Sequence, residues 1–416
     1  MPTTYVRWTT PVTNASQLAN TTYGIPTAQR KTDISPEIWY VRGDLSPFLH
    51  LAKAGMFRQR QVTDPKFQQF EQPEHAVTFT NTVTATATTG LTLTVDSSAM
   101  LKVGDKIMPI DGSGQVARVT AVNSATQVNI VWYSAAGAYI ASTPTANIAD
   151  NTYWLNLGNA SREGSTLPQI LQPQVAARTN YTETMRYPFG GTRHRLNSTL
   201  WTGRGISDMA RQEWFKAKRD IEHKLMWGTP SEHVSGSTVY RSTGGLFYWI
   251  TQQGGNSTNY AGASFDAGKF VNDMMKNFEY GSDTKILIAN PKLIGILDKF
   301  KFSKLQMTPG DEIFGLKVNW IETNFGRLMV VNSHALIMPN SYGAGTLNAM
   351  GFIVDPDFID YVYFDQDLHI EFNKQQPDYD GTVHEYIGDV GIAVNVSQNH
   401  GVIYNIVTVS FTTVTA

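Results

Sequence analysis

One amphipathic segment near the middle of the chain constrains the fold more than any other feature. Between residues 207 and 227, apolar side chains recur every three or four residues, and charged side chains occupy the opposite positions. Ser207 and Asp208 favour a helix start, and Gly228 favours its end. The apolar positions are Met209, Ala210, Trp214, Ala217, Ile221 and Leu225, and the charged ones are Arg211, Lys218, Arg219, Glu222 and Lys224. A helix of about 20 residues is about 30 Å long, so the segment predicts a strut that spans a whole domain.

A second pattern, of short alternating strands, fills residues 76–155. Thr, Val, Ala and Ile alternate there, and Gly, Asp and Asn mark the turns. The predicted strands are 78–80, 91–96, 106–112, 116–120 and 128–132. Several short strands at close, regular spacing indicate a small all-β module. Because the segments on either side are less regular, we expect this module to be an insertion.

The N-terminal segment predicts a polar arm with two short helices. Residues 1–30 are rich in Thr, Asn and Gln and show no sustained period, which is typical of a tail laid over another surface or of free disorder. Ser35-Pro36 and Ser46-Pro47 each place Pro at the first position of a helix, directly after a Ser cap.

The segment 236–385 mixes helices with strands, and the chain closes in strands. Asp266 predicts a helix cap, and Asn290-Pro291 starts a second helix. The expected strands are 285–289, the hairpin 316–320 with 327–331, and the closing pair 390–396 and 402–407. This alternation predicts an α+β fold that contains an α/β layer.

Composition excludes several classes of protein. A net charge of -2, from 33 basic and 35 acidic residues, excludes a polycationic nucleic-acid binder. The absence of Cys excludes disulfides, thiolate metal sites and Cys nucleophiles. The charged fraction of 16% is well below the ~25% of typical soluble domains, which a surface of Thr, Asn, Ser and Gln or partner chains covering large areas would explain. With no signal-like start and no apolar run near ~18 residues, we expect synthesis and folding in a cytoplasm and no membrane partner.

No group of residues indicates a catalytic, cofactor or metal site. Asp365, Asp367, His369 and Glu371 alternate, so on a regular strand they share one face, with Phe364, Leu368, Ile370 and Phe372 mostly on the other. Neighbours on such a face are ~6.5 Å apart and do not converge on one ion, so a solvated face is the better interpretation. Asp355, Asp357 and Asp360 lack the Gly and Glu of a calcium loop and indicate turn chemistry. We therefore expect no enzyme, although acids brought together in space remain an open alternative.

The order of these parts resembles the major capsid proteins of tailed bacteriophages, which have the HK97 fold. Local sequence is similar to the SU10-type branch. The segments that carry the resemblance are Leu155–Ser165, Asn180–Thr184, Gly190–Thr192, Asp220–Gly228, Thr243–Leu246 and Thr323–Val331. The resemblance covers most of residues 35–410.

The resemblance implies a division of the chain into capsid domains. Residues 1–56 become an N-terminal arm, and 57–175 an extension loop that bears the inserted β domain at about 76–155. Residues 176–235 become a peripheral domain with 207–227 as its spine helix, and 236–385 an axial domain. Residues 386–416 become a C-terminal β segment that returns to the peripheral domain.

The implied function is self-assembly of hexamers and pentamers into an icosahedral phage head around packaged double-stranded DNA. The implied partners are further copies of the chain, a separate scaffolding protein, a portal, a cement protein as an optional partner, and DNA as a non-specific neighbour. Assembly is expected in the cytoplasm of a bacterial host, and the mature protein in the virion. We expect non-covalent reinforcement of the shell.

Candidate assembly contacts are aromatic anchors on the arm and loop, and two charged residues. They are Trp39, Phe48, Phe57, Phe67, Glu163 and Arg219. Each aromatic residue fits local core equally well. Two other functions stay open: the shell of an encapsulin-like compartment, and, from a different class, a β-rich carbohydrate-active or adhesive protein.

Overall fold

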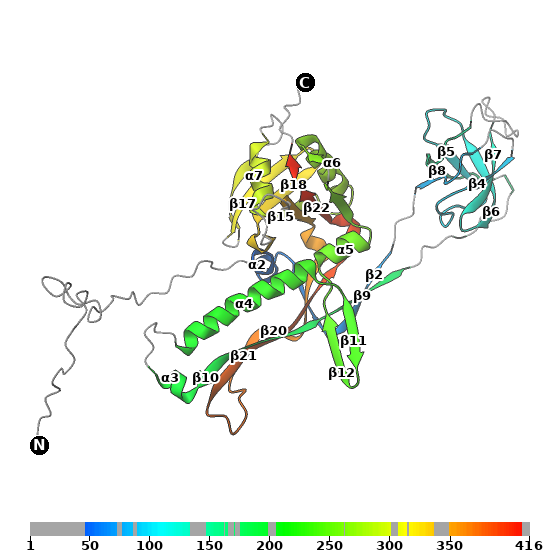
Figure 1. Cartoon of the computed structure of the whole chain (residues 1–416). Helices are drawn as coiled ribbons and strands as arrows, with labels where there is room; N and C mark the ends of the chain where they lie inside the picture. The colour runs from blue at the N-terminus through cyan, green and yellow to red at the C-terminus, as the bar shows by residue number, and fades with distance from the viewer. Residues whose placement is uncertain are drawn as a thin grey trace, which may run out of the picture. The chain divides into compact units, whose positions relative to one another are not determined.

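The computed structural model describes residues 46–72, 77–85, 90–133, 147–161, 163–164, 170, 175–198, 205–261, 263–300, 307–313, 316–336 and 349–409. The chain divides into two compact units (Figure 1). The main unit combines Met1–Pro65 with Tyr181–Ala416, and the inserted unit is Lys66–Asn180.

The inserted unit is built on one antiparallel six-stranded sheet. Its strands, in spatial order, are β3 (Thr78–Thr80), β8 (Tyr153–Asn159), β5 (Asp105–Pro109), β6 (Ala117–Ser124), β7 (Gln127–Trp132) and β4 (Gly90–Thr94). Alternate residues of β5 and β7 are buried, as expected for strands with one covered face. In this core the rings of Trp132 and Trp154 have centroids 5.7 Å apart, and Trp154 Nε1 donates to Asn81 Oδ1 at 3.3 Å. The predicted small β module is confirmed.

A two-stranded ribbon forms where the chain enters and leaves the inserted unit. It pairs β2 (Lys66–Glu71) with β9 (Ala176–Tyr181). Arg178 Nε lies 3.2 Å from Glu71 Oε2 across this ribbon. Phe67 is buried, whereas Phe70 is exposed.

In the main unit, the long helix α4 (Ile206–Trp227) runs along a four-stranded sheet (Figure 1). The strand order is β1 (Arg58–Val62), β20 (Ile359–Glu371), β21 (Gly381–Val394) and β10 (Glu183–Thr192). β1 is parallel to β20, and the other pairs are antiparallel. The ring of Trp214 on α4 packs 5.1 Å from that of Tyr386 on β21. The predicted strut helix is confirmed and begins one residue earlier than expected.

A mixed seven-stranded sheet organises the rest of the main unit. Its order is β13 (Asn256–Asn259), β22 (Gly401–Ile406), β19 (Ala349–Val354), β15 (Thr284–Ala289), β18 (Gly326–Asn332), β17 (Leu316–Thr323) and β16 (Met307–Ile313). Alternate residues of β15 point to opposite faces and so enter two different cores. Ile286 and Ile288 join the core of α4 and α5 (Leu246–Gln252), whereas Leu287 and Ala289 join that of α6 (Ala267–Asn277) and α7 (Pro291–Lys299).

The predicted helix caps and late hairpin are present. Asp266 accepts a hydrogen bond from the Lys269 N–H at 2.9 Å, and Asn290 accepts one from the Leu293 N–H at 2.9 Å. β17 and β18 pair as the predicted hairpin. The other short elements are α3 (Arg193–Asn197), β11 (Ser231–Ser235), β12 (Thr238–Ser242), β14 (Ser264–Phe265), η1 (His334–Leu336), η2 (Pro356–Phe358), η3 (Ser397–Asn399) and β23 (Thr408–Val409).

A buried carboxylate connects three distant segments of the main unit. Helix α2 (Pro47–Lys53) begins after Ser46, as predicted, and its Leu49 N–H donates to Glu222 Oε2 at 3.3 Å. Glu222 Oε1 accepts from Ser333 Oγ at 3.2 Å. The sequence placed Glu222 on the polar face of the helix, and this was wrong, because the side chain is fully buried as the acceptor for these donors. The helix predicted after Ser35 lies outside the described residues.

Strand pairing does not follow the domain boundary predicted near residue 385. β20, placed in the 236–385 segment, pairs with β1 and β21 beside α4. β22, placed in the C-terminal segment 386–416, pairs with β13 and β19 of the seven-stranded sheet. The chain therefore passes from one sheet to the other more often than the linear division of the sequence indicates.

We predict that Glu222→Ala lowers the free energy of unfolding by about 3 kcal/mol, because two buried donors lose their acceptor. Urea denaturation of the unassembled subunit measures the change. Glu213→Ala is the matched control on the same helix, since Glu213 forms an exposed ion pair with Lys216 at 3.3 Å; it should cost less than about 0.5 kcal/mol. Equal effects at the two positions would contradict the role of Glu222.

Candidate assembly surfaces

The strand that leads out to the inserted unit is fixed by a charge-assisted pair. Arg58 on β1 lies opposite Asp360 on β20, and its Nε and a terminal nitrogen each lie 2.9 Å from Asp360 Oδ1. Arg60 Nε lies 3.9 Å from Asp360 Oδ2. The Asp360 side chain is almost fully buried, so these partners offset the cost of removing it from water. Asp360 was expected in a turn with Asp355, and that was wrong, because it lies within a regular parallel pairing.

The strand that returns from the inserted unit is fixed in a similar way. Glu183, the first residue of β10, forms an ion pair with Lys224 near the C-terminus of α4. Its other oxygen accepts the Thr243 N–H at 3.3 Å. Farther along, Arg186 forms a two-bond pair with Glu385 of β21 at 2.8 and 2.7 Å, and this hydrogen bonding raises the pKa of Arg186. Both strands that flank the insertion are therefore held at their bases by charged side chains.

The predicted contact residues have different environments. Phe48 and Phe57 are buried in the core of α2 and α4, with ring centroids 5.0 Å apart, which is the local-core alternative. Phe67 is buried in the inserted unit, and Trp39 lies outside the described residues. Glu163 is exposed, and Arg219 is exposed beside Asp220 at 3.4 Å. The use of these residues in assembly stays a prediction.

The row of alternating acids on β20 is interrupted. Between the pairs Phe364↔Asp389 and His369↔Ile387, β20 advances five residues while β21 advances two. This bulge places His369 and Glu371 on the face of Phe364, so the expectation that they share a face with Asp365 was wrong. The residues form ion pairs instead: Lys53 Nζ lies 2.8 Å from Asp367, and Lys374 pairs with Glu371.

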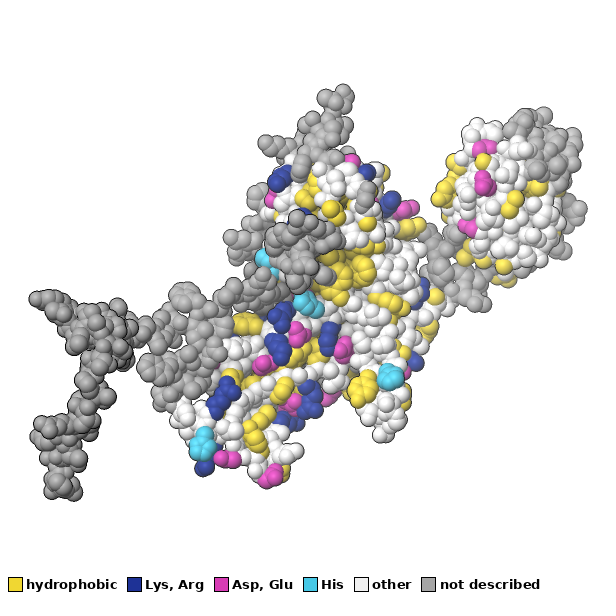
Figure 2. Space-filling view, viewed as in Figure 1, with side chains coloured by type: hydrophobic (Ala, Val, Ile, Leu, Met, Phe, Trp, Pro, Cys, Tyr) yellow, Lys and Arg dark blue, Asp and Glu magenta, His cyan; other side chains and the backbone are white. Residues whose placement is uncertain are grey.

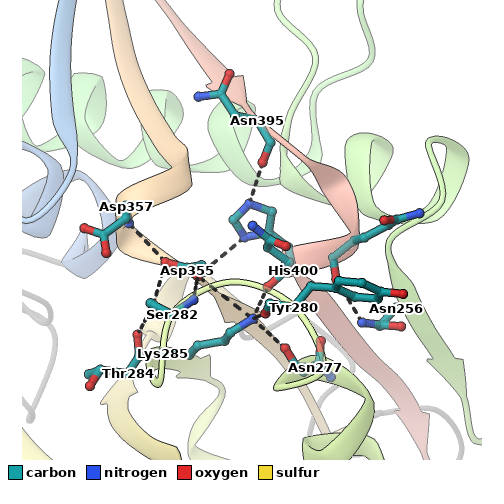
Figure 3. Close-up of polar contacts among 12 residues, drawn as sticks. Asn256, Asn277, Tyr280, Ser282, Thr284, Lys285, Asp355, Asp357, Asn395 and His400 are labelled. Carbon is teal, nitrogen blue, oxygen red and sulfur yellow. Dashed lines mark hydrogen bonds and ion pairs between the residues drawn. The ribbon is translucent and has the colours of Figure 1, made fainter. Parts of the chain in front are cut away.

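A buried group of Lys285, Asp355 and His400 lies in the main unit (Figure 3). Lys285 Nζ donates to the carbonyl oxygens of Asn277, Tyr280 and Asn399 at 2.5, 2.7 and 2.7 Å, and lies 4.0 Å from Asp355 Oδ2. Burial lowers the pKa of Lys285 to about 8, and the nearby Asp355 opposes the shift.

The side chains of Asp355 and His400 form hydrogen bonds with backbone groups, and Asp355 also with the Ser282 hydroxyl. Asp355 accepts from the Ser282 N–H at 2.7 Å, from Ser282 Oγ at 2.9 Å and from the Asp357 N–H at 3.2 Å, which confirms turn chemistry here. The Asp355 N–H donates to His400 Nδ1 at 3.1 Å, and His400 Nε2 lies 3.3 Å from the Asn395 carbonyl oxygen. Burial, and then the charge of Lys285, lower the pKa of His400 to about 4. The group links turns and is closed to solvent, so it has the character of a structural network.

Within the described ranges, no three His, Asp or Glu residues are arranged to hold a metal ion. No described helix is long and apolar enough to cross a membrane.

A projecting hairpin is the surface that the sequence interpretation missed. β11 and β12 pair antiparallel after α4 and project from the main unit in Figure 1. Figure 2 shows hydrophobic side chains beside a histidine at this projection. A cavity of about 340 Å³ is lined by Tyr240 and Arg241 of the hairpin, Glu183, Asp389 and Pro65. The sequence signal for this hairpin was Gly236, which lies between two runs of strand-forming residues. In the structure Gly236 forms the turn with a φ of 61°, which Gly adopts readily.

A family model described as SU10 major capsid protein matches residues 10–407. The chain belongs to the SU10 major capsid protein family. The family confirms the predicted HK97-like capsid fold and the function of a major capsid protein, the subunit of a viral shell. It also favours a phage capsid over the encapsulin and carbohydrate-active alternatives.

Solved structures similar to this family member include other shell proteins. One is described as the capsid of a native GTA particle, at 11% identity and a TM-score of 0.46, with 92% of this chain and 97% of that chain covered. Mycobacterium phage Adephagia matches at 11% identity and a TM-score of 0.42, with 93% and 97% covered. The holo-SrpI encapsulin complex of Synechococcus elongatus matches at 11% identity and a TM-score of 0.39, with 58% and 80% covered. No curated protein matches the sequence, so the assignment rests on the family model.

We predict that acid destabilises the subunit through His400. Its pKa is lowered from 6.5 to about 4 in the folded protein. Between these two pH values His400 is therefore protonated in the unfolded chain and neutral in the folded one. The free energy of unfolding is therefore unaffected by this group above pH 6.5, and it decreases as the pH falls toward 4, by about 3 kcal/mol in total. Urea denaturation of the wild type and of His400→Asn, each at about pH 7 and about pH 4.5, measures it, since Asn keeps a donor and an acceptor but does not titrate. A pH dependence that is the same in both proteins would contradict this role.

We predict that Asp360→Asn loosens β1. The change removes the charge that Arg58 and Arg60 share, and it should lower the free energy of unfolding by about 1 to 2 kcal/mol. Hydrogen exchange of the amides at 58–62 should accelerate. Asp380→Asn is the control, because Asp380 pairs with Arg193 at an exposed site, and it should leave both measurements unchanged.

Proposed function

We propose that the chain assembles through hexameric and pentameric capsomers into an icosahedral head that encloses packaged double-stranded DNA. The observation that carries the proposal is the family match across residues 10–407. Two features of the subunit support it. Within the described part of the chain, several two-stranded ribbons pair with no further strand, and such ribbons gain stability from added strands or from surfaces packed against them. The bases of the strands that lead to the inserted unit are fixed by ion pairs, which suits segments that transmit force between subunits.

We assign capsid roles to the parts of the chain by analogy with the HK97 fold. α4 acts as the spine of a peripheral domain at 176–235, which the four-stranded sheet extends. The seven-stranded sheet, mostly within 236–385, acts as the axial domain around the capsomer axis. Residues 57–175 act as the extension loop, with the inserted β domain at about 76–155. Residues 1–56 act as an arm over adjacent subunits, and part of 386–416 returns to the peripheral domain.

Assembly then relies on many modest contacts rather than on one site. Contacts of standard size bury about 1,600 Å² each, and a subunit held by several at once dissociates far more slowly than one held by a single contact. Glu163 and Arg219 are exposed and available for such contacts, and Trp39 serves on the arm. Phe48, Phe57 and Phe67 support the contacts from within by holding local structure.

The other partners follow from the same function. A separate scaffolding protein directs assembly in the cytoplasm of the bacterial host, a portal occupies one vertex, and a cement protein is an optional addition. DNA is a non-specific neighbour, and the net charge of -2 suits an inner wall that does not grip the packaged chain. The role is structural, with no substrate and no cofactor.

We predict that the purified protein, co-expressed with the scaffolding gene product, forms capsomers and closed shells. Negative-stain electron microscopy and mass photometry measure this directly. Nuclease-protected DNA inside heads from an infected host would separate the phage function from an enzyme-filled compartment. A chain that stays monomeric under every assembly condition would contradict the proposal.

A further inference from the structure

The hairpin of β11 and β12 exposes apolar side chains on both of its faces. Val234 pairs directly with Val239, and His233 pairs with Tyr240, so the two pairs occupy opposite faces. Val234 is 61% exposed, Val239 is 40% exposed and Tyr240 is 61% exposed. The ring of Tyr240 stacks on His233 with centroids 6.5 Å apart.

Such a hairpin has little stability of its own. An isolated two-stranded hairpin is marginal in water, and no other strand pairs with it within the described part of the chain. Exposed Val and Tyr side chains on a projecting element are typical of a surface that another protein covers. Its two charged residues, Glu232 and Arg241, bind each other at 2.9 Å, so the exposed Val and Tyr side chains lie among polar groups that carry no net charge when His233 is neutral.

The cavity beside the hairpin has a different character, because its lining is acidic. Asp389 lines it, and Asp389 Oδ1 is buried without a hydrogen-bond partner among the described residues. Arg241, the cation in the lining, is already bound to Glu232, and Glu183 is already bound to Lys224. A buried carboxylate oxygen without a donor requires an explanation, and a donor from outside the subunit supplies one.

We propose that the hairpin and this cavity form a contact with a second copy of the chain, which packs on Val234, Val239 and Tyr240 and places a Lys or Arg side chain beside Asp389. The proposal rests on the proposed function and adds a specific interface to it. The acidic side chains of the cavity favour a basic protein side chain over nucleic acid, because a negative lining repels phosphates and attracts Lys or Arg. Every subunit of a shell meets further copies of the same chain, so a second copy is the occupant that we propose, and a different protein is the outcome that the first test separates.

The first test uses the fact that the chain has no Cys. Val234→Cys introduces a single thiol on the hairpin, and its rate of reaction with a maleimide is measured in free subunits and in shells assembled with the scaffold. We expect labelling to be at least about tenfold slower in the shell, because interfaces pack as densely as protein interiors. Equal rates would overturn the proposal. Protection that appears only after DNA packaging, or only after a different protein is added, would also overturn it.

The second test concerns the cavity. Asp389→Asn keeps the shape of the side chain and removes its charge, and Asp389→Lys reverses the charge. We expect shell yield to fall with Asp389→Asn and to fall further with Asp389→Lys, while thermal unfolding of the Asp389→Asn subunit is unchanged. Asp357→Asn is the control, because its side chain is exposed at η2. Wild-type yield at Asp389→Asn and Asp389→Lys would overturn the contact.

The wild-type protein in the same assembly reaction separates the two proposals. If it fails to form shells, the proposed function fails. If it assembles and the hairpin thiol stays reactive, the capsid function stands and only this interface is wrong.

Discussion

The buried carboxylate of Glu222 is the contact on which the arrangement of the main unit depends. Its two oxygens bind the backbone of α2 and the hydroxyl of Ser333, which directly follows β18. The same helix packs on the four-stranded sheet and contributes Ile221 and Leu225 to the core beneath the seven-stranded sheet. A buried carboxyl group needs hydrogen-bond partners, so the relative positions of these segments must keep both donors in reach of Glu222. The two sheets are thereby held as one body around α4.

Charged side chains elsewhere in the main unit do similar structural work. Lys285 binds three carbonyl oxygens that come from the end of α6, the turn after it and the turn before β22. Asp360 and Glu183 fix the strands on either side of the insertion. Only 16% of the residues are charged, and several of these form contacts inside the main unit instead of lying on its surface. The remaining surface is left to Thr, Ser, Asn and apolar side chains, which pack against neighbours at a lower desolvation cost.

Local signals in the sequence predicted the elements well, because those signals act within a few residues. The periodicity of α4, the caps at Asp266 and Asn290 and the alternation in the inserted unit all reappear in the structure. The failures involve partners far apart in the chain. Glu222 looked like a polar-face residue because its partners are 173 and 111 residues away. The bulge in β20 changed the face of His369, and no short-range pattern indicates a bulge of that length.

The two ends of the insertion meet at the edge of the main unit. The Thr182 N–H donates to the Pro65 carbonyl oxygen at 2.8 Å, so the chain leaves and re-enters at adjacent residues. Closing such a gap needs only a short connection, and loop-closure entropy grows slowly with length. The inserted unit also has its own core, centred on Trp132 and Trp154. Because it has its own core and both of its ends lie at adjacent residues, its exchange for a different module, or for a tight turn, is expected to leave the register of the surrounding strands unchanged.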